Sequence, residues 1–312
     1  MKHFTSLADV DDPKQLLALA KELKENPYRW ADLGRQKTLC LLFLNPSLRT
    51  RLSTQKAAMQ LGMEVMVMNI NQDGWKLEFQ DGVIMDSGSA EHIKEAAAVI
   101  GSYCDIVGLR TFPQFESREE DYSERLLKAF MNHCGVPVVS LESATRHPLQ
   151  SLADWLTIET TKKTAKPKVV LSWAPHPRRL PQAVANSFLE WMKIADVDLH
   201  ITHPRGFELS EEFSQGVPVH YDQRSAFEGA DFVYTKNWSA YKDYGHLIYP
   251  HPDWTVSRHK LGSAKFMHCL PVRRNVVVTD NVLDSSNSIV IEQAGNRVPA
   301  AQAVLTTMLM NL

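Results

Sequence analysis

The sequence predicts an α/β protein of two doubly wound domains with parallel sheets, joined by interdomain helices. Short apolar runs alternate with helical patterns along the chain, and the runs are continuously apolar, as in strands that are buried on both faces. A polar, lysine-rich stretch at residues 161–167 interrupts this alternation, which then starts again. At roughly 150 residues per domain, a chain of 312 residues has room for two such halves.

The first half alternates between strands and helices. It opens with an amphipathic helix over Asp12–Lys24, whose leucines recur at helical spacing. The predicted strands are Thr38–Asn45, Met63–Ile70, Asp105–Arg110 and Val136–Leu141. The predicted helices are Thr50–Leu61, Ala90–Ser102, Glu119–His133 and, leading into the polar stretch, Leu149–Thr161.

The second half repeats this alternation with shorter elements. The predicted strands are Lys168–Trp173, Asp198–Thr202, Pro218–Tyr221, Asp231–Thr235 and Lys265–Cys269. The predicted helices are Gln182–Ile194, Glu208–Ser214, Arg224–Glu228 and Pro299–Leu312. We expect one domain in residues 1–150, a second in residues 151–293, and a C-terminal helix in residues 294–312 that packs back on the first domain.

The charge balance excludes several classes of protein. The chain has 34 Lys and Arg against 36 Asp and Glu, a formal net charge of −2, and neither sign forms a long block. Proteins that bind nucleic acid or a membrane surface draw their affinity mainly from an excess of basic residues. We therefore expect neither nucleic acid nor a membrane among the partners.

The cysteines indicate a reducing compartment. The four cysteines are scattered without a repeated spacing, which is typical of reduced thiols and not of a disulfide framework. No paired zinc-ligand spacing occurs among the histidines and cysteines, so no metal is expected. An acidic N-terminus and the lack of a run of about 18 apolar residues argue against a signal peptide or a membrane span. The expected location is the cytoplasm.

Candidate functional residues lie where ligands of such sheets bind, at the carboxyl ends of strands. The first strand runs into N-P-S-L-R-T-R, residues 45–51, where a helix begins. A helix N-terminus favours an anion, Ser47 and Thr50 add hydroxyl groups, and Arg49 and Arg51 add guanidinium groups suited to phosphate. The glycines of nucleotide-binding loops are missing. An ordinary N-cap with two surface arginines is the alternative.

Two further strand ends carry groups of the same kind. Arg110 closes the third strand, and the fourth runs into Glu142 and then H-P-L-Q, from His147 to Gln150, where another helix starts. If these strands are parallel neighbours, all these side chains meet at one edge of the sheet. A strand-end arginine or a histidine by itself is usually a surface or structural residue, but together they favour an anion site.

This series of motifs resembles that of the transcarbamylase family, whose members use carbamoyl phosphate. S-x-R-T-R, the strand-end arginine, H-P-x-Q and a later H-C-L-P at residues 268–271 occur in the family's order over nearly the whole chain. The resemblance implies a homotrimer with active sites shared between subunits, and neither a metal nor an organic cofactor. H-C-L-P, in place of H-P-L-P, indicates the ornithine side of the family.

The resemblance also implies roles for single residues. Carbamoyl phosphate would be bound by Ser47, Leu48 through its backbone N–H, Arg49, Thr50, Arg110, His147, Gln150, Cys269, Leu270 and Arg297. The residues expected to act in catalysis are Arg110, His147, Gln150 and Cys269. Arg110 and His147 would polarise the carbamoyl oxygen, and Gln150 with the backbone carbonyls of Cys269 and Leu270 would accept from the carbamoyl NH2. The leaving phosphate can take the proton of the amine, and the neighbours of Cys269 form no nucleophile pattern.

On the acceptor side, the chain resembles the N-acylornithine branch. Ornithine-specific members carry D-x-x-x-S-M-G in the second domain, whereas residues 235–245 lack it and offer Lys236. A blocked α-amine is a neutral amide, so cations can hold the α-carboxylate without an acidic partner for the amine. The residues implied to bind the acylornithine are Trp75, Ala90, Glu142, His176, Lys236, Cys269, Leu270 and Arg273. The implied reaction carbamoylates the side-chain amine of an Nα-acylated ornithine in arginine biosynthesis.

Two residues bear on the identity of the acyl group. Trp75 follows a turn at residues 71–74, and the resemblance implies that it reaches into a neighbouring subunit; a core tryptophan under the loop is the alternative. Acetyl-using members carry Glu and succinyl-using members carry Pro before the E-H-I-K-E run at residues 91–95, where this chain has Ala90. A glutamate there would repel a succinyl carboxylate, so its absence favours N-succinyl-L-ornithine. N-acetyl-L-ornithine and free L-ornithine are the alternatives.

Two further expectations concern catalysis and the path of the chain. A non-catalytic relative that keeps the fold would be expected to have lost the phosphate-binding arginines or H-P-L-Q, and both are present. The branch resemblance implies a knotted chain path in the second domain, although folds in general avoid knots. Periodicity in the sequence cannot show a knot.

Overall fold

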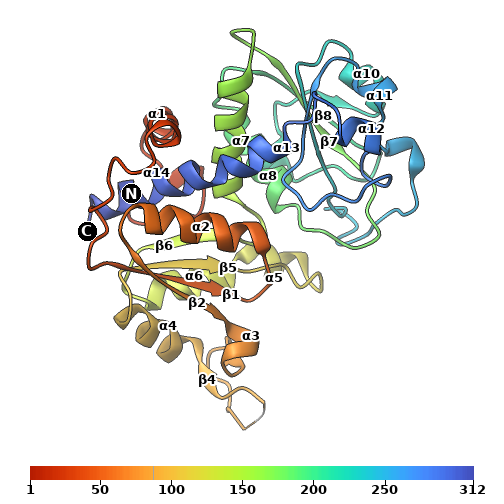
Figure 1. Cartoon of the computed structure of the whole chain (residues 1–312). Coiled ribbons are helices and arrows are strands. Elements are labelled where there is room, and N and C mark those ends of the chain that lie inside the picture. Colours follow the sequence, from red (N-terminus) through yellow and green to blue (C-terminus); the bar gives the residue numbers. More distant parts are fainter. Residues whose placement is uncertain (87) are drawn as a thin grey trace. The chain divides into compact units, whose positions relative to one another are not determined.

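The computed structural model describes residues 1–86 and 88–312, which form two compact units (Figure 1). Unit 1 contains Met1–Gln114, Glu119–Leu149 and Arg297–Leu312, and unit 2 contains Phe115–Arg118 and Gln150–Asn296. Both units are built on parallel sheets with helices, which confirms the predicted α/β class. The expected domain boundaries at residues 150 and 293 stay predictions.

Unit 1 is built on a parallel sheet with the strand order β2-β1-β5-β6. Its strands are β1 Thr38–Phe43, β2 Glu64–Asn69, β5 Ile106–Arg110 and β6 Val138–Glu142. At the end of β1, Phe43 lies between Asn69 of β2 and Arg110 of β5. The chain winds outward from β1 to β2 on one side and to β5 and β6 on the other. The topological switch point, where ligands of such sheets bind, is therefore at the carboxyl ends of β1 and β5.

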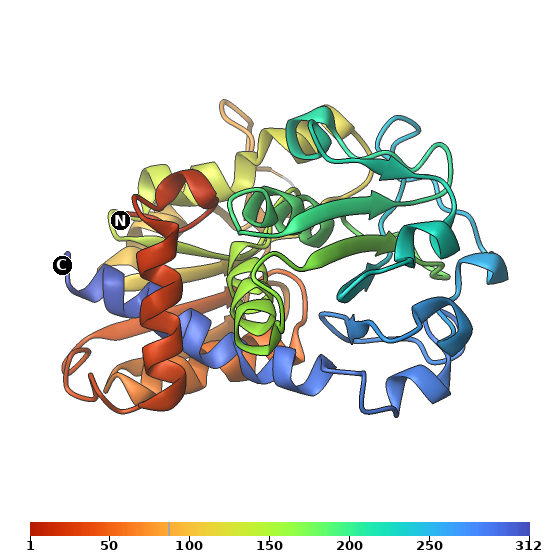
Figure 2. The same ribbon diagram turned by 90° about the horizontal axis from the view of Figure 1, so that it is seen from above.

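Helices cover this sheet on both faces. The elements between and after the strands are η1 Leu7–Asp9, α1 Pro13–Glu25, α2 Leu48–Gln60, α3 Ile70–Asp73, β3 Leu77–Glu78, β4 Glu91–His92, α4 Ile93–Ser102, α5 Arg118–Ser123, α6 Arg125–His133 and α14 Arg297–Leu309. Residues of α4 and α6 form one buried core with Leu42, Val107 and Leu109 of the sheet. On the other side, α14 packs against both α1 and α2 (Figures 1 and 2). The last helix of the chain thereby belongs to the same unit as the first.

Unit 2 repeats this winding with the strand order β9-β8-β7-β10-β11. Its strands are β7 Lys168–Trp173, β8 Asp198–Thr202, β9 Val219–His220, β10 Phe232–Lys236 and β11 Lys265–Met267, of which β7 and β8 have the predicted bounds. The helices of this part are α7 Pro148–Thr161, α8 Ala183–Met192, α9 Glu211–Ser214, α10 Gln223–Phe227, η2 Pro252–Trp254, α11 Arg258–Leu261, α12 Asp280–Leu283 and α13 Val290–Gly295. Because the chain winds outward from β7, the switch point of this sheet is at the carboxyl ends of β7 and β10.

Several helix bounds differ from prediction by a few residues, and two of the differences have a physical cause in the structure. The single helix expected over Glu119–His133 is wrong, because Glu124, with φ of 53° in the left-handed region, separates α5 from α6. Its carboxylate accepts hydrogen bonds from the Ser143 hydroxyl at 2.6 Å and the Thr145 N–H at 2.8 Å, which hold the residue out of helical geometry. The helix expected from Ala90 begins only at Ile93, because residues 91–92 pair with β3.

The strand β2 differs from prediction in its burial. β2 is an edge strand of its sheet, and it leaves Glu64 exposed and Met66 41% exposed. The expectation that this strand is buried on both faces is therefore wrong. The central strands β1 and β5 are buried along nearly their whole length, as predicted.

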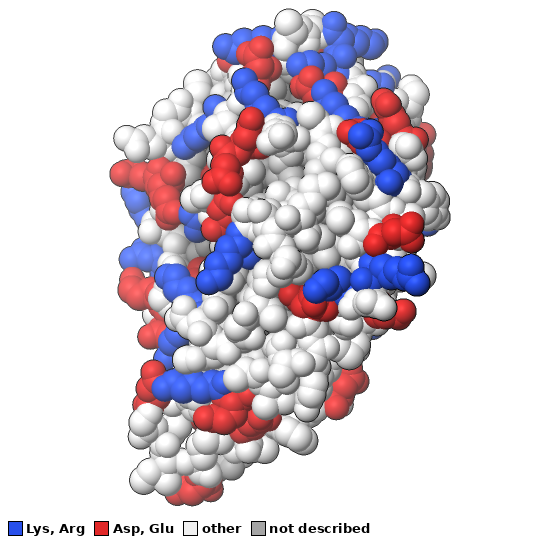
Figure 3. Space-filling view, turned by 90° about the vertical axis from the view of Figure 1, so that its left-hand side faces the viewer, with Lys and Arg blue, Asp and Glu red and all other residues white. Residues whose placement is uncertain are grey.

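The surface reflects the near-neutral composition. On the face shown in Figure 3, acidic and basic side chains are interspersed. Neither sign forms a continuous field there, so electrostatic attraction on this face is local. In the part of the chain that the structure describes, no helix combines the length and the apolar character that a membrane span requires.

Candidate active site

In unit 1, the predicted anion site lies at the switch point between β1 and β5. The chain leaves β1 at Phe43, and α2 begins at Leu48 with Ser47 as its N-cap. The Ser47 hydroxyl accepts a hydrogen bond from the Thr50 N–H at 3.3 Å. Because N–H groups in the first turn of a helix lack intrahelical acceptors, this end of α2 offers donors and a positive dipole to an anion.

Thr50 brings together two arginines from distant parts of the chain. Its hydroxyl oxygen accepts from Arg297 Nη2 at 2.7 Å and from Arg110 Nη1 at 3.4 Å, and all three residues are buried. Arg110 is placed by the end of β5, and Arg297 by the start of α14, which packs against α2. Three residues predicted to bind carbamoyl phosphate therefore meet, although 247 positions separate Thr50 from Arg297.

Glu142 lies beside Arg110 and offsets part of this positive charge. Its carboxylate is 2.7 Å from Arg110 Nη1 and 3.7 Å from His147 Nε2, and the three side chains are less than one tenth exposed. The resemblance implies a role for Glu142 on the acceptor side, whereas the structure places it with Arg110 and His147 in unit 1. A carboxylate that contacts both side chains can orient them toward a third group.

Arg110 keeps one donor for such a group. Its Nε atom is buried and has no hydrogen-bond acceptor within residues 1–86 and 88–312. Its guanidinium carbon lies 4.5 Å from the centre of the Phe112 ring. A buried donor without an acceptor costs about 1–3 kcal/mol. An oxygen atom of a bound ligand would remove this cost, which fits a residue that polarises a carbonyl group.

The two arginines of the N-P-S-L-R-T-R motif differ from each other. Arg49 is half-buried in the first turn of α2, next to the expected anion. Arg51 Nη2 instead donates to Asn69 Oδ1 at 3.0 Å, and its guanidinium lies 5.3 Å from the centre of the Phe43 ring. Arg51 is thus bound to the edge of the sheet, and Arg49 remains the phosphate-binding candidate of this pair.

In unit 2, cations predicted to bind the acceptor lie at the second switch point. Lys236 closes β10 and is buried, and His176 follows β7. Arg273 Nε donates to His176 Nε2 at 3.0 Å. Burial lowers the pKa of His176, and the positive charges of Lys236, Arg273 and Arg178 also lower it. A neutral imidazole among three cations leaves a positive cluster that suits a carboxylate.

The H-C-L-P segment follows β11 and contains a strained residue. Leu270 has φ of 56°, in the left-handed region that residues with a side chain rarely adopt. The Leu270 N–H donates to His268 Nδ1 at 2.8 Å, and the His268 N–H donates to Gln293 Oε1 at 2.9 Å. These two N–H groups are used within the protein, which fits a turn that is expected to offer the carbonyls of Cys269 and Leu270 to a ligand.

Asp154 and Gln293 of unit 2 belong to no sequence motif, although they are linked by hydrogen bonds to the predicted site residue Gln150. Gln150 Nε2 donates to Asp154 Oδ1 at 2.7 Å, and Gln293 Nε2 donates to the same oxygen at 2.7 Å. Asp154 lies four residues after Gln150 on a predicted helix, so helical spacing could have indicated their contact. Gln293 lies in a segment without a predicted element, and nothing in the local sequence indicates its role.

Trp75 and Ala90 lie in one surface loop of unit 1. Trp75 is 61% exposed, which excludes the alternative of a core tryptophan. Its Nε1 atom donates to Glu91 Oε2 at 2.7 Å, and the Ala90 N–H donates to the Lys76 carbonyl at 2.9 Å. These bonds join the segment after α3 to the segment before α4, so the exposed tryptophan and the exposed alanine are near neighbours.

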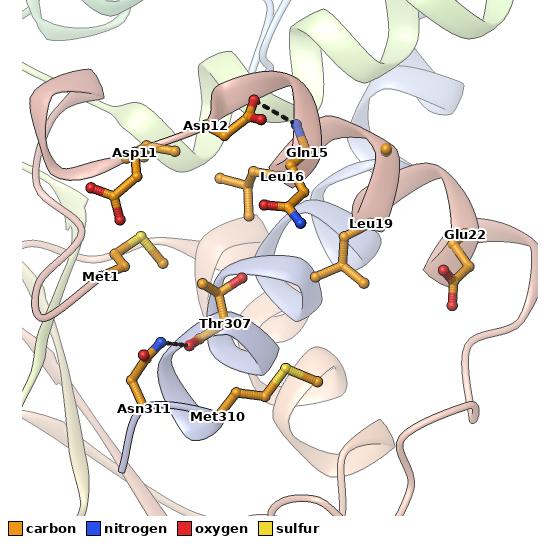
Figure 4. A pocket seen from close by; sticks show the side chains of 12 residues that line it. Met1, Asp11, Asp12, Gln15, Leu16, Leu19, Glu22, Thr307, Met310 and Asn311 are labelled. Carbon is orange, nitrogen blue, oxygen red and sulfur yellow. Dashed lines mark hydrogen bonds between the residues drawn. The ribbon is translucent and has the colours of Figure 1, made fainter.

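A cavity of about 480 Å³ lies elsewhere in unit 1, between α1 and the end of α14 (Figure 4). Its walls combine apolar side chains such as Leu16 and Leu19 with the carboxylates of Asp11, Asp12 and Glu22. No predicted site residue of the described chain lines it, and its acidic walls disfavour an anion. Within residues 1–86 and 88–312, acidic, histidine and cysteine side chains form no group of three or more that could hold a metal ion.

The fold and the two clusters define a class of protein: two doubly wound units, with an anion site at one switch point and a cationic cluster at the other. Residues 2–160 match the carbamoyl-P binding domain of aspartate/ornithine carbamoyltransferase, and residues 181–308 match its Asp/Orn binding domain. The chain belongs to the aspartate/ornithine carbamoyltransferase family.

Two relatives indicate to which branch of this family the chain is most similar. The chain is 55% identical to the N-succinylornithine carbamoyltransferase of Bacteroides fragilis, with 100% of both chains covered. It is 35% identical to the N-acetylornithine carbamoyltransferase of Xylella fastidiosa, with 99% of this chain and 98% of the relative covered.

Solved structures agree with this placement. An acetylornithine transcarbamylase complexed with acetylcitrulline superposes with a TM-score of 0.92 at 34% identity, with 99% of each chain covered. A variant of N-acetyl-L-ornithine transcarbamylase with alanine in place of a glutamate, complexed with carbamyl phosphate and N-succinyl-L-norvaline, gives a TM-score of 0.91 at 35% identity. That match covers 99% of this chain and 100% of the other.

Proposed function

We propose that this protein is a carbamoyltransferase that moves the carbamoyl group of carbamoyl phosphate to the side-chain amine of an Nα-acylated ornithine, with N-succinyl-L-ornithine favoured. The products are the N-acylcitrulline and phosphate, in arginine biosynthesis. The observation that carries the proposal is the meeting of Thr50, Arg110 and Arg297 at the N-terminus of α2. The 55% identity with an N-succinylornithine carbamoyltransferase supports it.

The residues of unit 1 suit the phosphate and carbonyl groups of carbamoyl phosphate. The phosphate would be bound by Ser47, the Leu48 N–H, Arg49, Thr50 and Arg297. Arg110 and His147 would donate to the carbamoyl oxygen, on which negative charge grows in the tetrahedral transition state. One such donor can contribute about 3 kcal/mol to the rate. Glu142, which contacts both side chains, would hold them in this orientation.

The reaction itself requires no covalent intermediate on the protein. The uncharged amine forms a bond to the carbamoyl carbon, the bond from that carbon to the phosphate oxygen breaks, and the phosphate takes a proton of the amine. Cys269 and Leu270 would act through their backbone carbonyls, which accept from the carbamoyl NH2 together with Gln150. Alignment of the two reactants accounts for much of the acceleration.

The acceptor would be held by its carboxylates. The cations Lys236 and Arg273, next to the neutral His176, form the positive cluster of unit 2 that suits the α-carboxylate. Ala90 stands where acetyl-using relatives carry a glutamate. N-acetyl-L-ornithine transcarbamylase variants with alanine, valine, serine or proline in place of a glutamate are complexed with N-succinyl-L-norvaline, which supports a succinyl group beside Ala90 and Trp75.

A homotrimer with shared active sites is part of the proposal. Leu48, Leu52 and Met59 of α2 are 57–68% exposed, and their spacing puts them on one face of the helix. Trp75 and Ile84 add exposed apolar surface in the same unit. Exposed apolar helix faces mark interfaces, so this face of α2 is where a second subunit would bind. Trp75 would reach into the site of a neighbouring subunit.

The proposed location is the cytoplasm. In the described chain, none of the four cysteines forms a disulfide bond. Reduced thiols are typical of that compartment.

A kinetic comparison of three acceptor substrates distinguishes the candidate functions. With carbamoyl phosphate as donor, kcat/KM should be highest for N-succinyl-L-ornithine, lower for N-acetyl-L-ornithine and lowest for free L-ornithine. A preference for the acetylated substrate would favour the second candidate. Equal or better use of free L-ornithine would overturn the N-acylornithine assignment.

Arg49→Ala tests the phosphate site. A hydrogen bond to a charged group contributes about 1.5–3 kcal/mol, so kcat/KM for carbamoyl phosphate should fall about 10–100-fold with the circular dichroism spectrum unchanged. Arg51→Ala is the matched control, because the Arg51 guanidinium is bound to Asn69, and it should have a much smaller effect. Near-normal turnover of Arg49→Ala would contradict the assignment.

A further inference from the structure

We propose that Asp154 is a positioning residue. It orients the groups that accept hydrogen bonds from the carbamoyl NH2, so that their carbonyl oxygens face the ligand. It acts directly on Gln150 and, through Gln293, on the Cys269–Leu270 turn. The inference rests on the proposed carbamoyl transfer and extends it to two residues outside the predicted site.

Asp154 is the centre of a buried polar network in unit 2. Its Oδ1 atom accepts from Gln150 Nε2 and from Gln293 Nε2, each at 2.7 Å. Gln150 is 1% exposed, and Asp154 and Gln293 are 0% exposed. Gln150 and Asp154 share one face of α7 because they are four residues apart, while Gln293 comes from α13. The network thus joins two helices that are far apart in the sequence.

The chemistry of the carboxylate decides how Gln150 is oriented. A glutamine side chain has an NH2 donor at one end and a carbonyl acceptor at the other, whereas a carboxylate can only accept. Asp154 can therefore bind only the NH2 end of Gln150, and the carbonyl oxygen becomes the end that faces away from Asp154. The carbamoyl NH2 is a donor and requires an acceptor of this kind.

The same logic extends to the H-C-L-P turn. Because Gln293 gives its NH2 to Asp154, its Oε1 atom accepts from the His268 N–H at 2.9 Å. His268 Nδ1 in turn accepts from the Leu270 N–H at 2.8 Å. Leu270 has φ of 56°, and such backbone persists only where its surroundings hold it. One carboxylate thus sets the direction of every hydrogen bond from Gln150 to Leu270.

Tyr234 is a buried neighbour of this network. It is fully buried in β10 beside Asp154 and Cys269. Burial raises the pKa of its phenol, and the negative charge of Asp154 raises it further, so the phenol stays neutral. A buried carboxylate among neutral amides is costly for stability. A role in orienting the ligand's acceptors accounts for a charge at this position.

The test compares carbamoyl phosphate with acetyl phosphate, which carries a methyl group in place of the NH2. Asp154→Asn keeps the shape of the side chain but offers the two glutamines a donor as well as an acceptor. In calorimetric titrations, wild-type protein should bind carbamoyl phosphate more tightly than acetyl phosphate. Asp154→Asn should reduce this preference about tenfold or more, while affinity for inorganic phosphate stays unchanged.

Asp105→Asn is the matched control. Asp105 accepts from the Thr38 N–H and from Lys37 in unit 1, at the opposite end of β5 from Arg110. This variant should keep the wild-type preference. If thermal melting shows that Asp154→Asn is unfolded, Gln293→Met takes its place. This substitution keeps the volume of the side chain and removes the hydrogen bond to His268. It too should reduce the preference for carbamoyl phosphate.

The outcomes separate the inference from the function on which it rests. A folded Asp154→Asn protein, or a folded Gln293→Met protein in its place, that keeps the full preference would overturn the inference. An equal loss of affinity for all three ligands, inorganic phosphate included, would indicate a merely structural role and also overturn it. If wild-type protein binds carbamoyl phosphate and acetyl phosphate equally well, the inference alone is overturned. If it does not bind carbamoyl phosphate, the proposed function itself is wrong, and the inference with it.

Discussion

At the scale of single residues, each unit has one buried carboxylate that contacts a residue predicted to bind the substrate. In unit 1, Glu142 contacts Arg110 and His147. In unit 2, Asp154 binds Gln150 and Gln293. Buried carboxylates are costly unless donors surround them, and here the donors include Arg110 and Gln150, which are predicted to bind carbamoyl phosphate. We therefore expect Glu142 and Asp154 to position the side chains that are predicted to touch the substrate.

Ala90 is the residue at which a single change should alter the choice of acceptor. Ala90→Glu should lower kcat/KM for N-succinyl-L-ornithine about tenfold more than for N-acetyl-L-ornithine, because two carboxylates a few ångströms apart near a protein surface repel by about 1–4 kcal/mol. Ala90→Gln, with similar size and no charge, is the control and should change the ratio little. The same loss for both substrates in Ala90→Glu would count against a succinyl group at this position.

At the scale of elements, the two switch points place the two clusters. β1 and β5 end at the anion site of unit 1, and β7 and β10 end beside the cations of unit 2. The break between α5 and α6 serves the first of these sites. Glu124 leaves the helix and accepts hydrogen bonds from Ser143 and Thr145 in the loop after β6, and Thr145 lies two residues before His147. The loop that presents His147 is thereby anchored to a helix.

Glu124→Ala should destabilise this loop. Its Oε1 atom accepts from Ser143 Oγ, Thr145 N and Thr145 Oγ1 at 2.5–2.8 Å, and both partners are buried. Leaving buried donors without an acceptor should lower the free energy of unfolding by about 2 kcal/mol, measured by urea denaturation. Glu120→Ala on the exposed face of α5 is the control. A loss no larger than that of the control would show that the contact carries little energy.

The edge of the second sheet should weaken in acid. His200 Nδ1 and His220 Nε2 are 3.0 Å apart, and Asp198 lies 3.2 Å from His200 Nε2. Burial lowers the pKa of His220 from its ordinary value of 6.5, and the charges of His200 and Lys168 also lower it. The folded protein therefore holds this proton less tightly than the unfolded chain, so stability is full above about pH 6.5 and is lost as the pH falls through the lowered pKa.

The variant His220→Gln isolates this effect. The urea midpoint of the wild-type protein should fall between pH 7.5 and pH 5, and the fall should be smaller in His220→Gln because the titrating group is gone. Lys168 and Asp198 stay in place in this comparison. Equal falls in both proteins would assign the acid sensitivity to other groups.

At the scale of the whole molecule, the exposed apolar face of α2 should control assembly. Leu52→Glu puts a negative charge between Leu48 and Met59 on that face. The charge would be buried without a partner in the interface between subunits, which opposes association. Light scattering after gel filtration should show trimers for the wild-type protein and monomers for the variant, with activity lost alongside. Ile291→Glu, at an exposed apolar residue of unit 2, is the control and should stay trimeric. A trimeric Leu52→Glu protein would exclude this face as the interface.

The sequence by itself determines the alternation of elements, because that pattern depends on neighbouring residues only. β7 and β8 have their predicted bounds, and β1 and α2 differ from prediction by a few residues at their ends. Apolar runs and helical spacing are local properties, so they can be recognised without the fold. The motifs at strand ends are local in the same way, and they identify the family before any contact is known.

Only the tertiary structure decides which distant residues meet. Arg297 reaches Thr50 because α14 packs on α2, and Gln293 reaches Asp154 although no local pattern marks it. The left-handed Glu124 breaks a helix that its own sequence favours, because its carboxylate is bound by a loop beyond the next strand. These contacts join residues that are far apart in the sequence. Their energy exceeds the small differences in helix propensity on which a prediction from local sequence depends.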